Sequence, residues 1–160
     1  MEALLVWLQG SLLGELMRSA GVWAYGVVNL VHILSVATLF GSVLVLDLRL
    51  LGAWRRVPLA ALSQPTVPLA IGGFVGAVAS GLCMVTTNAT EYRGNPFVIV
   101  KFAALALAVA NTIVVQCLPA WRDRAQSPSP STGRWLVPAG GVSLVAWVTV
   151  VAAGRMIGYW

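Results

Sequence analysis

The feature that most constrains this chain is a series of four apolar runs, each long enough to cross a lipid bilayer. As an α-helix, about 20 apolar residues span a hydrocarbon core about 30 Å thick. The runs at residues 22–48, 67–87, 96–118 and 136–157 meet this requirement. Backbone polar groups inside hydrocarbon must be paired within the protein, so each run is predicted to be a helix. The sequence therefore predicts an all-α integral membrane protein, with a four-helix bundle over residues 21–160.

The composition agrees with a membrane protein and excludes one class of partner. Of the 160 residues, 59% are hydrophobic and only 9% are charged, whereas soluble domains carry about 25% charged residues. The net charge of +5 is compatible with nucleic-acid binding, but the basic residues cluster in short loops between apolar runs. We therefore predict the lipid bilayer as the main partner and no nucleic-acid partner.

Residues 1–20 differ in character from the four runs. Leucines recur there at three- and four-residue spacing, with polar residues between them, which predicts an amphipathic helix. Trp7 is a residue type that favours the headgroup level. The segment lacks the basic start and small-residue cleavage site of a signal peptide, although a cleaved signal remains the alternative. The prediction is a helix that lies flat on the membrane interface.

The loop charges predict an orientation. Six arginines flank the ends of the first and third runs, against four basic residues on the opposite side: Arg49, Arg55, Arg56, Arg122, Arg124 and Arg134 against Arg18, Arg93, Lys101 and Arg155. The positive-inside rule then places both termini outside the cytoplasm. We expect a multi-pass protein of the bacterial inner membrane, present as a homo-oligomer or within a larger membrane complex.

His32 is the only histidine, and it lies about ten residues into the first run. At 1.5 Å per residue, the imidazole would sit about 15 Å below the outer face. An ionisable group at that depth is a functional-site hypothesis. Three readings remain open: a structural hydrogen bond, a ligand to haem iron or copper, and a proton-transfer group. A single histidine excludes a bis-histidine haem within one chain.

Four further residues are candidates for cofactor binding. Lys101 and Arg155 lie near the outer face, where they would hold haem propionates or reach toward lipid headgroups. Gly73 and Gly76 belong to two registers of small residues in the second run. Such residues allow close helix packing, and alternatively they leave room for a flat cofactor.

The remaining polar patterns give little support for a hydrolase or a transferase. Asp47 ends the first run beside Arg49, which predicts an interfacial ion pair that fixes the helix depth. The chain shows no thiolate cluster, paired carboxylates or nucleophile–base pattern, so no catalytic residue is predicted.

Several segments carry a family resemblance. They are residues 31–42 (VHILSVATLFGS), residues 47–52 (DLRLLG), Asn95-Pro96-Phe97 and Lys101-Phe102. Together they resemble an uncharacterised family of small bacterial four-span membrane proteins, the domain of unknown function 6644. The likeness covers about residues 28–116, and the family name implies no activity.

A looser likeness concerns function. The layout is similar to the copper-resistance D membrane domain and to cytochrome b561-like bundles, which implies copper handling or b-type haem. Gln116 stands where that pattern would place a histidine near the end of the third run, so His32 is the remaining candidate ligand. Three functions stay open: a haem b electron-transfer subunit, a copper-handling or transport protein with Met84 and Met156 near its path, and a cofactor-free structural or partner-binding subunit.

Overall fold

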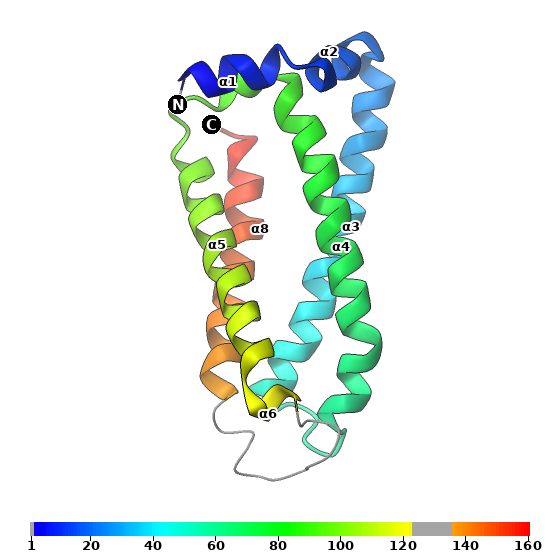
Figure 1. The fold of residues 1–160 in the computed structure, drawn as a ribbon, viewed down its shortest axis with the longest axis vertical. Helices are drawn as coiled ribbons and strands as arrows, with labels where there is room; N and C mark the ends of the chain where they lie inside the picture. The colour runs from blue at the N-terminus through cyan, green and yellow to red at the C-terminus, as the bar shows by residue number, and fades with distance from the viewer. Residues whose placement is uncertain (1, 123–135) are drawn as a thin grey trace. The chain divides into compact units, whose positions relative to one another are not determined.

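The computed structural model describes residues 2–122 and 136–160. Four of its helices are long and apolar enough to cross a membrane: α3 (Gly21–Leu50), α4 (Leu59–Thr87), α5 (Pro96–Cys117) and α8 (Val137–Ile157) (Figure 1). The predicted all-α, four-span fold is confirmed, and the chain is a multi-pass membrane protein. Helices α3, α5 and α8 begin and end within two residues of the predicted runs.

Helix α4 begins at Leu59, well before the predicted start at Val67. Prolines are typical of the first turn of a helix, so the sequence predicts a start near Pro65 and Pro68, but both lie inside α4. Each proline removes one backbone hydrogen bond from a helix, which membrane-spanning helices tolerate where other polar groups lie nearby. Thr66 lies between the two prolines and donates its hydroxyl to the carbonyl oxygen of Leu62 at 2.7 Å.

The described chain forms two compact units, and each contains part of α3 and part of α4. The first unit comprises residues 1–39 and 71–95, and the second comprises residues 40–70 and 96–160. Besides its parts of α3 and α4, the first unit contains α1 (Glu2–Gln9), α2 (Leu12–Ser19) and the 3-10 helix η1 (Ala89–Tyr92). The second contains α5, α6 (Pro119–Arg122) and α8.

The N-terminal segment forms two helices rather than the single predicted helix. The break falls at Gly10 and Ser11, where Ser11 becomes the N-cap of α2 and accepts a hydrogen bond from the backbone N–H of Gly14 at 3.3 Å. Helix α1 lies against η1, and α2 lies between the adjoining ends of α3 and α4 (Figure 1). Trp7 and Leu12 remain exposed on them. The position of this segment at the membrane interface stays a prediction.

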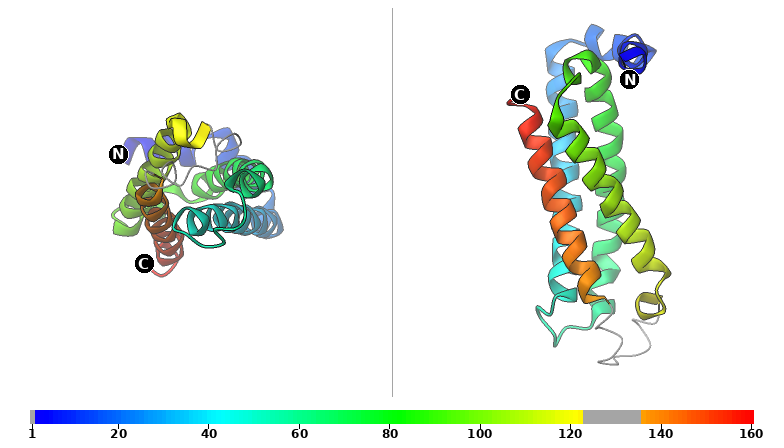
Figure 2. Two further views of the ribbon diagram at one scale, coloured as in Figure 1. Left: turned by 90° about the horizontal axis from the view of Figure 1, so that it is seen from below. Right: turned by 90° about the vertical axis from the view of Figure 1, so that its left-hand side faces the viewer.

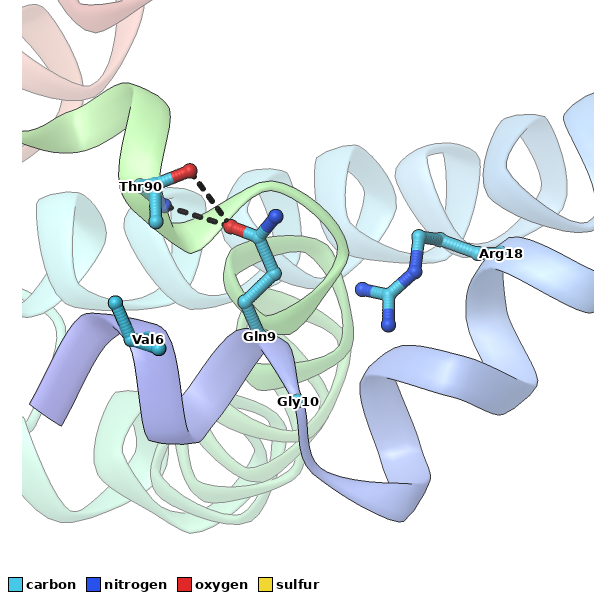
Figure 3. Close-up of a pocket in the computed structure, with 5 residues that line it drawn as sticks. All are labelled: Val6, Gln9, Gly10, Arg18 and Thr90. Atoms are coloured by element: carbon cyan, nitrogen blue, oxygen red, sulfur yellow. Dashed lines mark hydrogen bonds between the residues drawn. The ribbon is translucent and has the colours of Figure 1, made fainter.

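Two side chains connect the N-terminal helices to η1 and to the last residues of α4. The Gln9 side-chain oxygen accepts hydrogen bonds from the Thr90 backbone N–H at 3.0 Å and from the Thr90 hydroxyl at 2.8 Å (Figure 3). Arg18 donates to the carbonyl oxygens of Thr87 at 3.2 Å and Thr86 at 3.5 Å. A guanidinium at this position pairs carbonyls that have no partner in the last helical turn and complements the helix dipole.

In the second unit, α5 and α8 lie side by side over much of their length (Figures 1 and 2). Asn111 of α5 donates its side-chain amide to the carbonyl oxygen of Ala139 in α8 at 3.1 Å. A small buried core of Leu46, Val115, Trp121 and Leu136 is surrounded by apolar residues from α3, α4, α6 and α8 and by Leu118. This end of the unit also holds Asp47, which is described with the site residues below.

Candidate functional site

His32 lies half-buried on α3, facing α4 within the first unit. Its Nδ1 atom is 3.0 Å from the hydroxyl oxygen of Ser80, a residue that is only 5% exposed. Gly81 lies beside the ring, since a Cβ atom placed on it would come within 3.2 Å of His32 Cε1. The sole histidine is thus held by α4, in the part of the helix that is rich in small residues.

The hydrogen bonds of Ser80 determine which imidazole nitrogen carries the proton. The Ser80 hydroxyl oxygen is 2.5 Å from the carbonyl oxygen of Gly76, one turn earlier in α4. A hydroxyl has one proton and a carbonyl can only accept, so Ser80 donates to Gly76 and accepts from His32. In the neutral imidazole, Nδ1 then carries the hydrogen and Nε2 carries the lone pair. Histidines that ligate metals are commonly oriented by such a hydrogen bond from the other ring nitrogen.

Gly73 and Gly76 bring α4 close to α3. A Cβ atom on Gly73 would lie 2.8 Å from the carbonyl oxygen of Ser35, and one on Gly76 would collide with the Ser35 side chain. Because α3 fills the space beside both glycines, close helix packing accounts for them without a cofactor. This close approach allows Ser80 to reach His32, so the two glycines support the site indirectly.

Lys101 and Arg155 belong to the second unit, on the neighbouring helices α5 and α8. Lys101 is half-buried against Gly154, where a Cβ atom would lie 3.6 Å from the lysine Nζ. Arg155 donates to the Tyr159 hydroxyl, and its Cζ atom lies 4.7 Å from the centroid of the Tyr159 ring. The structure thus places these two cations at one end of the α5–α8 pair. Their contact with haem propionates stays a prediction.

Asp47 has a different partner from the one its sequence position suggested. Its side chain is 3% exposed and hydrogen-bonds to Ser143 of α8. Arg49 turns away and donates to the carbonyl oxygens of Val57 at 2.8 Å and Arg55 at 3.4 Å. The predicted Asp47–Arg49 ion pair is therefore wrong. No sequence pattern links Asp47 to Ser143, because the two residues lie almost a hundred positions apart.

The chain belongs to a family of unknown function, DUF6644, whose model matches residues 4–160. The match extends the resemblance seen between residues 28 and 116 to almost the whole chain. Comparisons with curated proteins and with solved structures found no match. The description of the family names no activity, so a function has to be inferred from the site.

A pair of neighbouring glycines tests the close approach of α4 to α3. We expect Gly73→Ala to destabilise the protein by about 1–3 kcal/mol, because the new methyl group meets backbone atoms of α3. Gly72→Ala is the control, since nothing lies within 4 Å of its added Cβ. Thermal unfolding in detergent measures both variants. Equal midpoints for the two would contradict the packing inferred at Gly73.

Proposed function

We propose that this protein is an electron-transfer subunit of the bacterial inner membrane that binds a b-type haem through Nε2 of His32. The observation that carries the proposal is the hydrogen-bond chain from His32 through Ser80 to Gly76. It orients the imidazole and puts the lone pair on Nε2, the condition that an axial ligand must meet. When bound, a haem supplies one-electron redox chemistry.

The donor set favours haem over a metal held only by side chains. Among the described residues, no group of three His, Cys, Asp or Glu side chains is placed to hold a metal ion. A copper or zinc site usually draws three or four ligands from the protein. Haem brings four ring nitrogens of its own and needs one or two from the chain. One oriented histidine is therefore a better match for haem.

The match between this chain and a haem depends on Nε2 of His32 rather than on the glycines. Gly73 and Gly76 already have α3 against them, so they provide packing rather than a surface for the macrocycle. With a single histidine in the chain, the second axial position falls to another residue type or stays open. A homodimer would supply a second His32. Lys101 and Arg155 enter this proposal as sequence-based partners for the propionates.

The proposed orientation places both termini outside the cytoplasm. It is supported by the arginines that flank α3 and α4, where Arg49, Arg55 and Arg56 lie in or beside one tight connection. The imidazole of His32 lies eleven residues after the start of α3 at Gly21. In this orientation His32 lies in the half of the membrane that faces outward, which suits a redox partner on that side.

The first experiment asks whether haem depends on His32. We expect wild-type protein, purified in mild detergent, to show a Soret band and a reduced α-band with nearly one haem per chain. His32→Gly should lose both bands, and added imidazole should restore them by filling the vacated ligand position. Thr38→Ala is the control, because its hydroxyl bonds only to Leu34 of its own helix.

Each other outcome of that experiment contradicts the haem proposal in a different way. Wild-type protein that stays colourless after haem supplementation overturns it. Copper bound by the wild type and lost in His32→Gly would make His32 a copper ligand. A colourless, metal-free protein that His32→Gly merely destabilises would make the His32–Ser80 hydrogen bond structural.

Ser80→Ala separates an orienting hydrogen bond from general support of the fold. Loss of an outer partner of a ligating histidine typically lowers affinity for the metal about 10–100-fold. We expect Ser80→Ala to bind haem more weakly by this factor and to shift the reduction potential of the haem that remains. Ala79→Ser is the control, because residue 79 is exposed on the same helix. An unchanged potential and affinity in Ser80→Ala would contradict the inferred tautomer.

The orientation is tested with reporters fused after Trp160. An alkaline phosphatase fusion is active only outside the bacterial cytoplasm, whereas green fluorescent protein exported in unfolded form stays dark there. We expect an active phosphatase fusion and a dark fluorescent fusion. The opposite pair of results would reverse the orientation without affecting the haem proposal.

A further inference from the structure

The second unit contains a carboxyl group that is almost completely removed from solvent. Asp47 is 3% exposed, and one of its oxygens, Oδ2, is fully buried without a hydrogen-bond partner among the described residues. The side chain of Asp47 hydrogen-bonds to Ser143 of α8. A buried carboxylate oxygen without a partner is energetically unfavourable, and such a group in a membrane-spanning helix is a candidate for function.

Helix α8 packs closely on α3 beside this carboxyl group. A Cβ atom on Gly140 would lie 3.3 Å from the backbone oxygen of Asp47 and 2.9 Å from the Leu50 side chain. Along the same face of α8, one turn beyond Ser143, the indole nitrogen of Trp147 is also buried without a partner among the described residues. Among the described residues, the end of α3 and helix α8 thus contain a buried acceptor and a buried donor that have no hydrogen-bond partner, which is uncommon in proteins.

The charges on the surrounding elements do not neutralise Asp47. The part of α4 in this unit carries no titratable residue, and Arg155 is the only one on α8, about 18 Å from Ser143 along the helix axis. Of the groups at this end, Cys117 and Arg122 are exposed, and Arg122 donates to the carbonyl oxygen of Gln116. The neighbouring core residues Leu46 and Leu136 are apolar. Among the described residues, an ionised Asp47 would therefore lack the oppositely charged partner that a buried charge requires.

We propose that Asp47 is a proton-binding site of the membrane domain, and that the packing of α8 on α3 controls its occupancy. When α8 is packed, an O–H bond forms at Oδ2 with a proton from solvent, and the carboxyl group becomes neutral. When the contact opens and water enters, that bond breaks and the proton returns to solvent. A metal cation would need several more oxygen ligands than Asp47 and Ser143 offer. This inference is independent of the haem proposal, because His32 belongs to the first unit.

The chain is well suited to a direct spectroscopic test, because it contains only two aspartates, Asp47 and Asp123. In the Asp123→Asn background, carbon-13 in the aspartate carboxyl group marks Asp47 alone. We expect infrared spectra of the full-length protein in lipid nanodiscs at pH 7 to contain a protonated carboxyl C=O band that shifts on labelling. Asp47→Asn, which keeps the shape of the side chain, should abolish it. Ser143→Ala should move it to higher frequency by removing the hydrogen bond.

A second pair of variants tests the control by α8. Gly140→Val places a branched side chain against α3, whereas Gly141→Val meets only the Leu51 side chain, 3.9 Å from its added Cβ. We expect the band at pH 7 to be lost or much weakened in Gly140→Val and retained in Gly141→Val. Each variant is checked for a single peak on size-exclusion chromatography.

Three results would overturn the inference. The first is a labelled Asp47 that shows only carboxylate bands at pH 7. The second is a protonated band that disappears when sodium or potassium is added at constant pH, which would make Asp47 a cation site. The third is a band of equal strength in Gly140→Val and Gly141→Val, which would remove the control by α8.

Discussion

Every polar group inside a membrane-spanning helix must find its partner within the protein, and most features of this structure follow from that constraint. Many hydroxyl groups in the spans meet it locally, by donating to a carbonyl oxygen one turn earlier: Thr38 to Leu34, Thr66 to Leu62, Ser80 to Gly76, Thr112 to Ala108 and Thr149 to Val145. These side chains need no neighbouring helix. An imidazole, a carboxyl group and an ammonium group cannot be paired in this way. His32, Asp47 and Lys101 therefore differ from the hydroxyl residues of the spans.

The same constraint explains why glycines lie where two membrane-spanning helices exchange a hydrogen bond. A hydrogen bond between two spans requires the helices to approach more closely than large side chains allow. Gly73 and Gly76 permit this in the first unit, and Gly140 does the same between α8 and α3 in the second. In both units the glycine lies one or two turns from the polar group whose partner is on the other helix. The small residues and the ionisable residues therefore act together.

The sequence was sufficient for the four-span fold, because hydropathy over about 20 residues reflects the thickness of the bilayer rather than any detail of packing. It was less reliable at the ends of elements. Pro65 and Pro68 looked like a helix start, yet α4 continues through both, and residues 1–20 looked like one helix, yet Ser11 caps a second one. The second error arises where a local rule competes with contacts from distant residues, since Arg18 bonds to the last residues of α4 and Gln9 bonds to Thr90 of η1.

For the site, the sequence could identify the ionisable residues but not their partners. His32 was recognised because an imidazole is rare in an apolar run. Ser80 was not recognised as the partner of His32. The rotation of α4 against α3 depends on which glycines face α3, and the sequence offers two registers of small residues. Asp47 was assigned to the nearest arginine along the chain, whereas its partner Ser143 comes from α8. Periodicity within one helix carries no information on the register between two helices.

Ser80 and Ser143 have different effects on the ionisable residues that they contact, His32 and Asp47, and the two proposals depend on these effects. Ser80 gives its only proton to the Gly76 carbonyl, so it must accept from His32, and the imidazole is left with a lone pair on Nε2. Ser143 hydrogen-bonds to the side chain of Asp47, and Oδ2 of that side chain remains a buried acceptor without a partner among the described residues. The first arrangement underlies the proposal that His32 binds haem iron, and the second underlies the proposal that Asp47 binds a proton. Because the two serines act in different units, a haem-free protein with a protonated Asp47 is as coherent as a haem protein without one, and each site can be judged on its own measurement.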